Sequence, residues 1–458
     1  MSETVNSDIN VGSKQTESAE THNSTSSHNQ SSNQSSRVSA QENASSNANQ
    51  MERSLTKRHV QFIAIGGTIG TGLFLGSGKS ISLTGPSIVF VYIIVGLIMF
   101  LLMRGIGELM YKDPNQHTFI SFITRYLGRG WGNFAGWSYW FVLVLIGMSE
   151  ITAVSTYCVT FFQTFDIDVS HWKWLIEVVF LAALVCINLV AVKLFGETEF
   201  WFSMIKITLI VALIVTAVVM ALIGYHYSAT PLHGGVMSPA GHAGLDNIFN
   251  NFSLMPNGWL SFLMSFQMVF YAYQLIEFVG VTVSETKNPR QVLPKAVNEI
   301  IVRVLVFYVG ALIAIMLIVP WQQFRATNAE GVFMSPFIMV FQYAGLHWAS
   351  ALVFFVVITA ASSALNSLLY SAGRHMYQIA LESPSPLLGK LRKVSRTKVP
   401  ARAILFSSAL ILLSPIINSI PGIHGAFILF ASASSAVIIM IYILIMVTHR
   451  KYLSLIHI

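Results

Sequence analysis

Ten runs of about twenty mostly apolar residues fill most of this chain, and this repetition limits its fold more than any other feature. Each run can cross a bilayer core as a helix, because helices satisfy their backbone groups internally. A β-barrel would need shorter, alternating segments, and the run 207–222 does not alternate. We therefore expect an all-α, polytopic membrane protein. The predicted spans are 60–82, 86–110, 131–161, 172–192, 199–224, 258–283, 300–320, 346–372, 402–419 and 425–447.

Composition excludes a soluble globular domain. Hydrophobic residues make up 54% of the chain and charged residues only 10%. The net charge of +7 lies mainly in short loops between spans, so membrane topology explains it better than nucleic-acid binding. Cys158 and Cys186 both lie within apolar runs, and they indicate no disulfide framework.

The two ends of the chain differ from its apolar part. Residues 1–57 are predicted to be a disordered cytoplasmic tail, because the first fifty are rich in Ser, Asn and Gln and have almost no large apolar side chain. Residues 58–452 are expected to form the membrane core. Back-translated, the last six residues, 453–458, are compatible with an adapter used in sequencing libraries, so we expect a non-native end and a natural chain that continues, with a natural ending as the alternative.

Basic residues lie almost entirely on one side of the predicted membrane. With the N-terminus inside, the outward loops hold little more than Arg325, with Lys173 at a span edge. This asymmetry favours ten spans and a cytoplasmic N-terminus. The inward loops hold Lys112, Arg125, Arg129, Lys193, Lys287, Arg290, Lys295, Arg374, Lys390, Arg392, Lys393, Arg396 and Lys398.

The first span contains a dense glycine cluster. Four glycines fall within the seven residues from Gly66 to Gly72, and each costs up to about 1 kcal/mol in a helix relative to alanine. Unwinding there would free backbone amides and a positive helix end to bind a carboxylate. The alternative is close helix packing through small residues. The density of glycines favours unwinding.

The residues around this cluster resemble a known family. The stretch from Arg58 to Gly96, which contains IGGTIGTGLF from Ile65 to Phe74, is similar to the amino acid permeases of the amino acid–polyamine–organocation superfamily. Further matching motifs are Gly107-Glu108-Leu109, Gly136-Trp137, Glu199-Phe200-Trp201-Phe202, Ile205-Lys206-Ile207, Glu285-Thr286-Lys287-Asn288-Pro289 and Leu293-Pro294-Lys295-Ala296. Gly76-Ser77-Gly78-Lys79 and Ala360-Ala361-Ser362-Ser363-Ala364 most resemble bacterial D-serine/D-alanine/glycine proton symporters.

This resemblance implies the leucine-transporter fold, with two inverted five-helix repeats and a substrate held where spans 1 and 6 break. Relatives usually have twelve helices, so the last two are expected to be missing here. The likeness places the substrate carboxylate on the backbone of Gly70, Thr71 and Gly72. It places the ammonium near Thr68 and near the span 6 break, which it locates from Tyr271 to Gln274.

Span 6 departs from the family pattern at one position. Relatives commonly carry a glycine two residues before Glu277, where this chain has Leu275. Leu275 could narrow the pocket, and Gln274 could add a hydrogen-bonding side chain. The substrate implied by the resemblance is therefore less certain than the transport class.

Two charged residues inside spans are expected to couple transport to protons, since such charges are expensive in a bilayer. Lys206 lies about two turns inside span 5, and the resemblance implies that it is the proton-responsive group. Glu277 resembles the family's second proton-linked or gating carboxylate. The alternatives are a structural lysine bonded to span 1 carbonyls and a static brace of the span 6 break.

The leading interpretation is a cell-membrane symporter that imports small neutral amino acids with protons, namely glycine, alanine and serine, with D-forms as further candidates. An amino acid exchanger and a non-transporting sensor are the alternatives. No metal, cofactor or catalytic site is expected, because His226, His233 and His242 lack ligand spacing and no catalytic motif is present. Without a Walker loop, ion gradients are the expected energy source.

Overall fold

The computed structural model describes residues 69–113, 118–190, 192–231, 237–250, 252–278, 289–325, 335–345, 347–420 and 425–456. The chain divides into two units, Met1–Gln50 and Met51–Ile458, and every described residue belongs to the second. The predicted tail, Thr68 and the last two residues lie outside the described part.

Long helices make up most of this second unit, as the apolar runs predict. The first half contains α3 (Thr71–Phe74), α4 (Gly76–Thr84), η1 (Gly85–Ser87), α5 (Ile88–Lys112), α6 (Ile120–Leu127), α7 (Arg129–Gln163), η2 (Ser170–Trp172), α8 (Lys173–Val190) and α9 (Val192–Leu222). The second half contains α10 (Asp246–Phe249), α11 (Gly258–Tyr273), α13 (Pro289–Ile318), η3 (Trp321–Arg325), α14 (Pro336–Tyr343), α15 (His347–Glu382), α16 (Pro386–Gly389), η4 (Lys390–Arg392), α17 (Ala401–Ile411), α18 (Ser414–Asn418) and α19 (Ala426–Ile456).

Seven helices in the described part are long and apolar enough to cross a membrane. They are Gly76–Lys112, Arg129–Gln163, Ser170–Val190, Phe195–Leu222, Ala351–Glu382, Ala401–Asn418 and Ala426–Leu455. The other predicted spans are the first, sixth and seventh. The described part of span 1 runs into the Gly76–Lys112 helix, α11 is short because it ends at Tyr273, and α13 contributes the shorter apolar stretch Leu305–Ile318.

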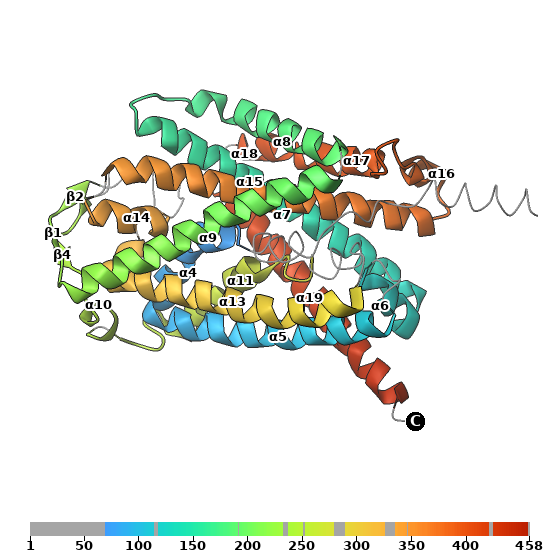
Figure 1. Ribbon diagram of the computed structural model, residues 1–458, viewed down its shortest axis with the longest axis horizontal. Helices are drawn as coiled ribbons and strands as arrows, with labels where there is room; N and C mark the ends of the chain where they lie inside the picture. Colours follow the sequence, from blue (N-terminus) through green and yellow to red (C-terminus); the bar gives the residue numbers. More distant parts are fainter. Residues whose placement is uncertain are drawn as a thin grey trace, which may run out of the picture. The chain divides into compact units, whose positions relative to one another are not determined.

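The loop between α9 and α11 contains short strands. β1 (His226–Tyr227) pairs antiparallel with β4 (Gly241–His242), and β2 (Thr230–Pro231) pairs antiparallel with β3 (Met237–Ser238). Figure 1 shows β1, β4 and α10 at the left end of the bundle and α6 and α16 at the right end. The loop predicted to face outward therefore lies opposite the predicted inward segments.

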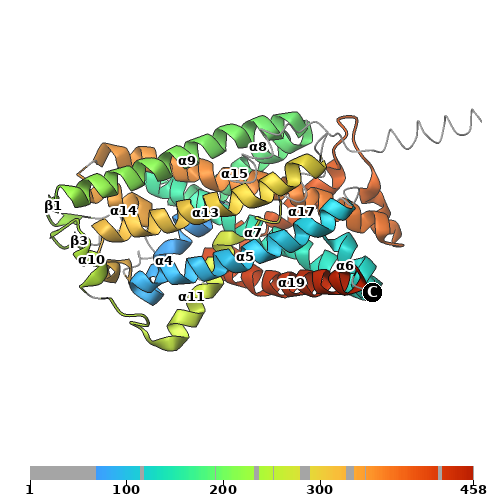
Figure 2. The same ribbon diagram turned by 60° about the horizontal axis from the view of Figure 1, so that its bottom comes forward.

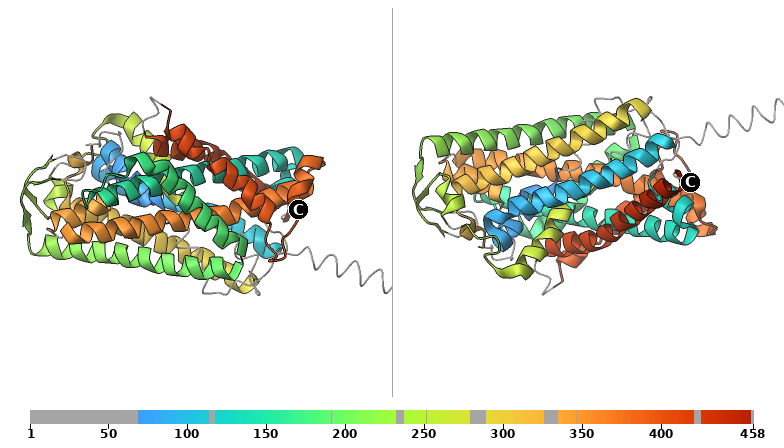
Figure 3. Two further views of the ribbon diagram at one scale, coloured as in Figure 1. Left: turned by 90° about the horizontal axis from the view of Figure 1, so that it is seen from above. Right: turned by 90° about the horizontal axis from the view of Figure 1, so that it is seen from below.

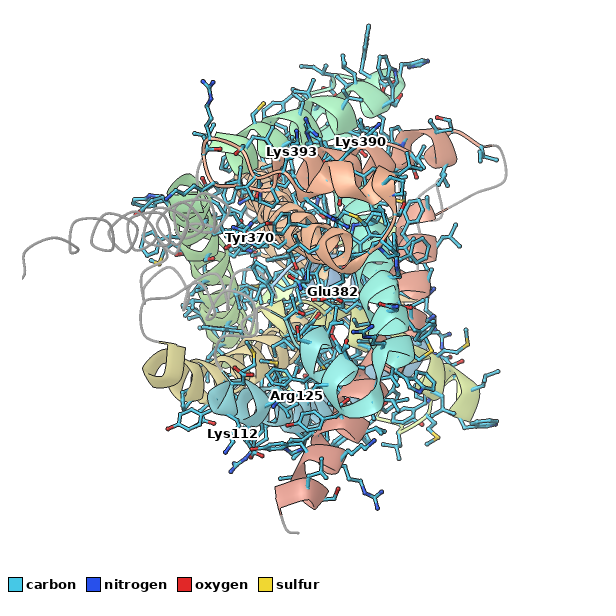
Figure 4. The ribbon with its side chains drawn as sticks, turned by 90° about the vertical axis from the view of Figure 1, so that its right-hand side faces the viewer. Lys112, Arg125, Tyr370, Glu382, Lys390 and Lys393 are labelled. Atoms are coloured by element: carbon cyan, nitrogen blue, oxygen red, sulfur yellow. The ribbon has the colours of Figure 1, made fainter. Side chains whose placement is uncertain are left out.

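Basic side chains mark the end that carries α6 and α16. Figure 4 looks onto this end and labels Lys112, Arg125, Lys390 and Lys393 there. All four belong to the set predicted to face the cytoplasm. They come from separate parts of the chain, so the fold gathers charges that the sequence disperses.

α7 lies in the middle of the bundle, and it packs most extensively against α15 and α19. Its apolar window is 94% buried, whereas that of α8 is 28% buried. Seen from below in Figure 3, α9, α13, α5 and α19 lie side by side in that order. Figure 2 shows α11 beside α4, which it contacts.

Candidate functional site

The described part of span 1 begins with two non-helical residues, and we call Gly70, directly before α3, the first break. Its backbone is extended, with φ −117° and ψ −157°, and α3 begins at the next residue, Thr71. The Gly70 carbonyl accepts bonds from the amides of Leu73 and Phe74, which close the first turn of α3. An extended Gly70 is compatible with the unwinding predicted from the glycine cluster, whose first two glycines, Gly66 and Gly67, lie outside the described residues.

The second break follows α11. Tyr273 is the last helical residue, Gln274 is extended with ψ 156°, and Leu275 has a φ of +71°. The Gln274 side chain faces α19, where its amide nitrogen donates to the Ser435 hydroxyl over 3.4 Å and its oxygen accepts from Ser434 over 3.3 Å. The break thus begins at Gln274, the last residue of the predicted Tyr271 to Gln274 interval.

The two breaks touch each other. A Cβ atom built on Gly72 would lie 2.5 Å from the Cα atom of Ala272, which is closer than real contacts allow. Only a glycine at position 72 lets the two backbones approach this closely. The Tyr271 hydroxyl lies 3.3 Å from the Thr71 hydroxyl oxygen, so side chains as well as backbones meet here.

Glu150 of α7 is the acidic group at this meeting point, and the sequence did not identify its partners. Its Oε1 atom accepts a 2.8 Å hydrogen bond from the Thr71 hydroxyl and lies 3.3 Å from the Tyr271 hydroxyl. Tyr271 also donates to the hydroxyl of Ser149 over 2.9 Å. Within the described residues, Glu150 Oε2 is buried and accepts no hydrogen bond. A charge inside an apolar span was the only signal for Glu150.

Lys206 is fully buried on α9 and links three spans. Its ammonium donates to the Ile69 carbonyl at the first break over 3.1 Å and to the Ser363 hydroxyl of α15 over 2.9 Å. Ser363 donates in turn to Glu199 over 2.7 Å. Glu199 was noted in the sequence only as part of a motif, and nothing there linked it to Ser363.

Glu277 lies in a separate cluster, within the turn 274–277 that follows α11. Its two oxygens accept hydrogen bonds from the hydroxyls of Tyr139 on α7 and Tyr442 on α19, each 2.9 Å long. The His375 ring lies 4.6 Å from that of Tyr139. Glu277 therefore joins α7 and α19 to the segment after the break.

The structure brings together only some of the predicted site residues. Gly70, Thr71 and Tyr271 lie around Glu150, Gly72 contacts Ala272, and Lys206 is bonded to the residue before Gly70. Gln274 faces α19, Glu277 accepts hydrogen bonds from Tyr139 and Tyr442, and Thr68 lies outside the described residues. Among the residues that the structure describes, no three His, Cys, Asp or Glu side chains group closely enough to hold a metal.

A helix start and a helix end that meet around buried polar groups in a membrane bundle are typical of the substrate sites of secondary transporters. The family model described as amino acid permease matches residues 59–454, and the chain belongs to this family. It is thus a multi-pass membrane transporter of amino acids, not an enzyme. Its all-α fold is leucine-transporter-like, with two inverted five-helix repeats.

Several curated relatives are similar over the same region. A serine permease of Lactococcus lactis is 45% identical over 88% of this chain and 85% of its own length. A DL-alanine permease of the same organism is 44% identical over 88% of this chain and 82% of its own length. The D-serine/D-alanine/glycine transporter of Escherichia coli is 39% identical over 88% of this chain and 81% of its own length.

Proposed function

We propose that this permease imports small neutral amino acids, such as glycine, alanine and serine, together with protons, and that D-forms are among its candidate substrates. The names of the three relatives support this substrate class. The observation that carries the coupling is Lys206, a fully buried cation bonded to both the first break and α15. Such a charge is expensive within a bilayer and is usually functional.

The substrate is proposed to lie between the two breaks. Its carboxylate binds the backbone around Gly70, Thr71 and Gly72, where extended backbone and a helix start offer amides. Its ammonium lies near Thr68, near the second break and next to Glu150 Oε2, a buried acceptor with no partner in the described part. Opposite charge and hydrogen bonding at both ends would select a zwitterion.

Lys206 and Glu277 are the proposed proton-coupling groups. Lys206 touches the break itself, so protonation and movement of span 1 affect each other. Glu277 already accepts two tyrosine hydroxyls, and this favours its alternative role as a brace more than the sequence alone did. We therefore place the main coupling role on Lys206.

The test is uptake into proteoliposomes in sodium-free buffer under an imposed inward proton gradient. One pH unit corresponds to about 1.4 kcal/mol, so coupling to one proton supports about tenfold accumulation. Wild-type protein should accumulate glycine, alanine or serine, and a protonophore should abolish this. Lys206→Met cannot titrate, so it should lose accumulation while retaining exchange. Lys112→Met, the same change at an exposed helix end, should behave like wild type.

Two outcomes would contradict the symporter. Uptake that ignores the gradient but requires internal amino acid indicates the exchanger. Binding without any flux indicates the sensor. Competition by a panel of L- and D-amino acids would then define the substrate and its preferred enantiomer.

A further inference from the structure

A continuous chain of buried polar side chains runs from the first break into the bundle. From Lys206 it continues through Ser363 to Glu199, whose other oxygen accepts from the Asn366 amide over 2.7 Å. The Asn366 oxygen accepts from Asn188 of α8, again over 2.7 Å. All five side chains are at most 4% exposed.

Ser363 has the geometry of a proton relay. Its oxygen accepts from Lys206 over 2.9 Å, and its own hydroxyl hydrogen points to Glu199 Oε2 over 2.7 Å. Both distances lie within the range for proton transfer between side chains. Lys206 and Glu199 lie seven residues apart on α9, so Ser363 bridges two groups on one helix face.

The chain has a direction in the fold. Glu199 is two turns closer than Lys206 to the start of α9, and Asn188 lies next to the end of α8. These helix ends lie toward the right of Figure 1, where α6 and α16 are found. The polar chain thus leads from the middle of the bundle toward the end predicted to be cytoplasmic.

Two carboxylates lie close to the contacts of Lys206, Glu199 on the same helix and Glu150 on α7. Glu150 is bonded to the hydroxyl of Thr71 at the substrate site, whereas Glu199 is connected to Lys206 through one hydroxyl. Of the two carboxylates, Glu199 is therefore the one that can exchange a proton with Lys206 through Ser363. Moving one proton between Lys206 and Glu199 converts an ion pair into two neutral groups, so the pair stays neutral in both forms. A buried pair avoids the cost of an isolated charge in this way.

We propose that Glu199 is the second half of the proton-coupling pair and that Ser363 relays the proton between the two. The proposal rests on the proposed symport. In the step, Ser363 Oγ takes a proton from the Lys206 ammonium while its own hydroxyl proton passes to Glu199 Oε2. The products are a neutral amine, an intact hydroxyl and a neutral carboxylic acid.

Movement of the first break would trigger this step. The Ile69 carbonyl, an acceptor of the Lys206 ammonium, belongs to the break. When span 1 moves away, the ammonium loses that acceptor, and the charged form of the buried lysine becomes more costly. Transfer to Glu199 removes the charge, and the neutral carboxylic acid of Glu199 then holds the proton until it is released.

The experiment compares gradient-driven accumulation with substrate exchange in the same proteoliposomes. Ser363→Ala should lower accumulation at least about tenfold while exchange persists, because the relay hydroxyl is gone. Ser363→Thr keeps a hydroxyl and should restore accumulation. Ser362→Ala is the matched control, since the neighbouring Ser362 hydroxyl bonds to the Ile358 carbonyl of its own helix and is also buried.

Glu199→Gln provides an independent arm, and it should match Lys206→Met in losing accumulation but not exchange. Accumulation by Ser363→Ala at the wild-type rate would overturn the relay while leaving the symporter intact. Equal loss of exchange and accumulation in Ser363→Ala would also overturn it, because that result defines a structural serine. A wild-type protein indifferent to the proton gradient would overturn the symporter and the relay together.

Discussion

Leu275 is a residue whose backbone conflicts with its side chain. Its φ of +71° lies in the left-handed region, which a residue with a Cβ enters at a cost of about 1–3 kcal/mol. Glycine adopts this region without that cost. The family resemblance places a glycine at this position, and the observed backbone gives the physical reason.

This conflict predicts that glycine is more stable than alanine at position 275, the reverse of the usual order of the two residues in a helix. Leu275→Gly and Leu275→Ala both lose a buried side chain, so both should destabilise the protein by roughly 2–5 kcal/mol. Only glycine relieves the backbone, so Leu275→Gly should unfold about 1 kcal/mol less easily than Leu275→Ala. Thermal unfolding in detergent measures the difference.

Leu209 provides the matched control, because it is buried within the regular helix α9. There the usual order should hold, with Leu209→Ala more stable than Leu209→Gly by about 1 kcal/mol. The same order at both positions would show that the left-handed backbone of Leu275 is not a source of strain.

At the residue scale, sequence reasoning identified the groups that stand out within their own segment. Gly70, Gly72 and Lys206 are conspicuous in apolar helices. It did not find that Glu150 binds Thr71 or that Ser363 binds Glu199, because these partners are 79 and 164 residues apart. Such contacts depend on how helices pack, which local pattern does not specify.

At the scale of elements, the two breaks form one unit of structure. α3 and the end of α11 pack so closely that a side chain at Gly72 would collide with the backbone atoms of Ala272. At Gly70 the nearest obstacle is Glu150 Oε1, at 3.0 Å, followed by the side chain of Ala364. A carboxylate can rotate, whereas a helix backbone has to move as a whole.

Alanine substitutions should therefore separate the two glycines. Gly72→Ala should abolish substrate binding and cost about 1–3 kcal/mol or more in unfolding free energy, because α3 and α11 must move apart. Gly70→Ala should cost less than Gly72→Ala, since its φ of −117° suits any residue and the atoms that its Cβ would meet belong to side chains. Binding of radiolabelled glycine and thermal unfolding are the measurements. Equal effects at both positions would mean that backbone contact between the breaks does not matter.

Helix ends were predicted well where burial and sequence agree. Span 3, predicted over 131–161, is the α7 helix Arg129–Gln163. Span 6 was predicted over 258–283 with a break from Tyr271 to Gln274, and α11 ends at Tyr273, within that interval; residues 279–283 lie outside the described part. Span 8 extends past 372 to Glu382 as α15, since Gly373 and Arg374 do not terminate it.

At the scale of the whole molecule, the chain segregates its loops by charge. The basic end carries α6 and α16, and the strands β1 and β4 lie at the opposite end (Figure 1). If positive charge faces the cytoplasm, Ser385→Cys is inaccessible to an impermeant maleimide in intact cells. Ala229→Cys, in the loop that carries the strands, should react.

The labelling needs a background without the native thiols, because Cys186 is exposed. Replacing Cys158 and Cys186 by serine or alanine provides it, and permeabilised cells are the positive control for Ser385→Cys. Labelling of both positions from outside, or of Ser385→Cys alone, would contradict the predicted orientation.

The burial of the apolar middle of α7 has a consequence for the evolution of substrate choice. Four of its side chains form hydrogen bonds with different neighbours. Glu150 bonds to Thr71 at the first break, and Tyr139 bonds to Glu277. Trp140 bonds to Ser407 of α17, and Ser155 bonds to Glu177 of α8. A substitution on α7 that suits a new substrate is therefore expected to disturb several of these contacts at once. Selection should therefore diversify substrates mainly through the short segments around Gly70 and Leu275, while α7 is inherited almost unchanged.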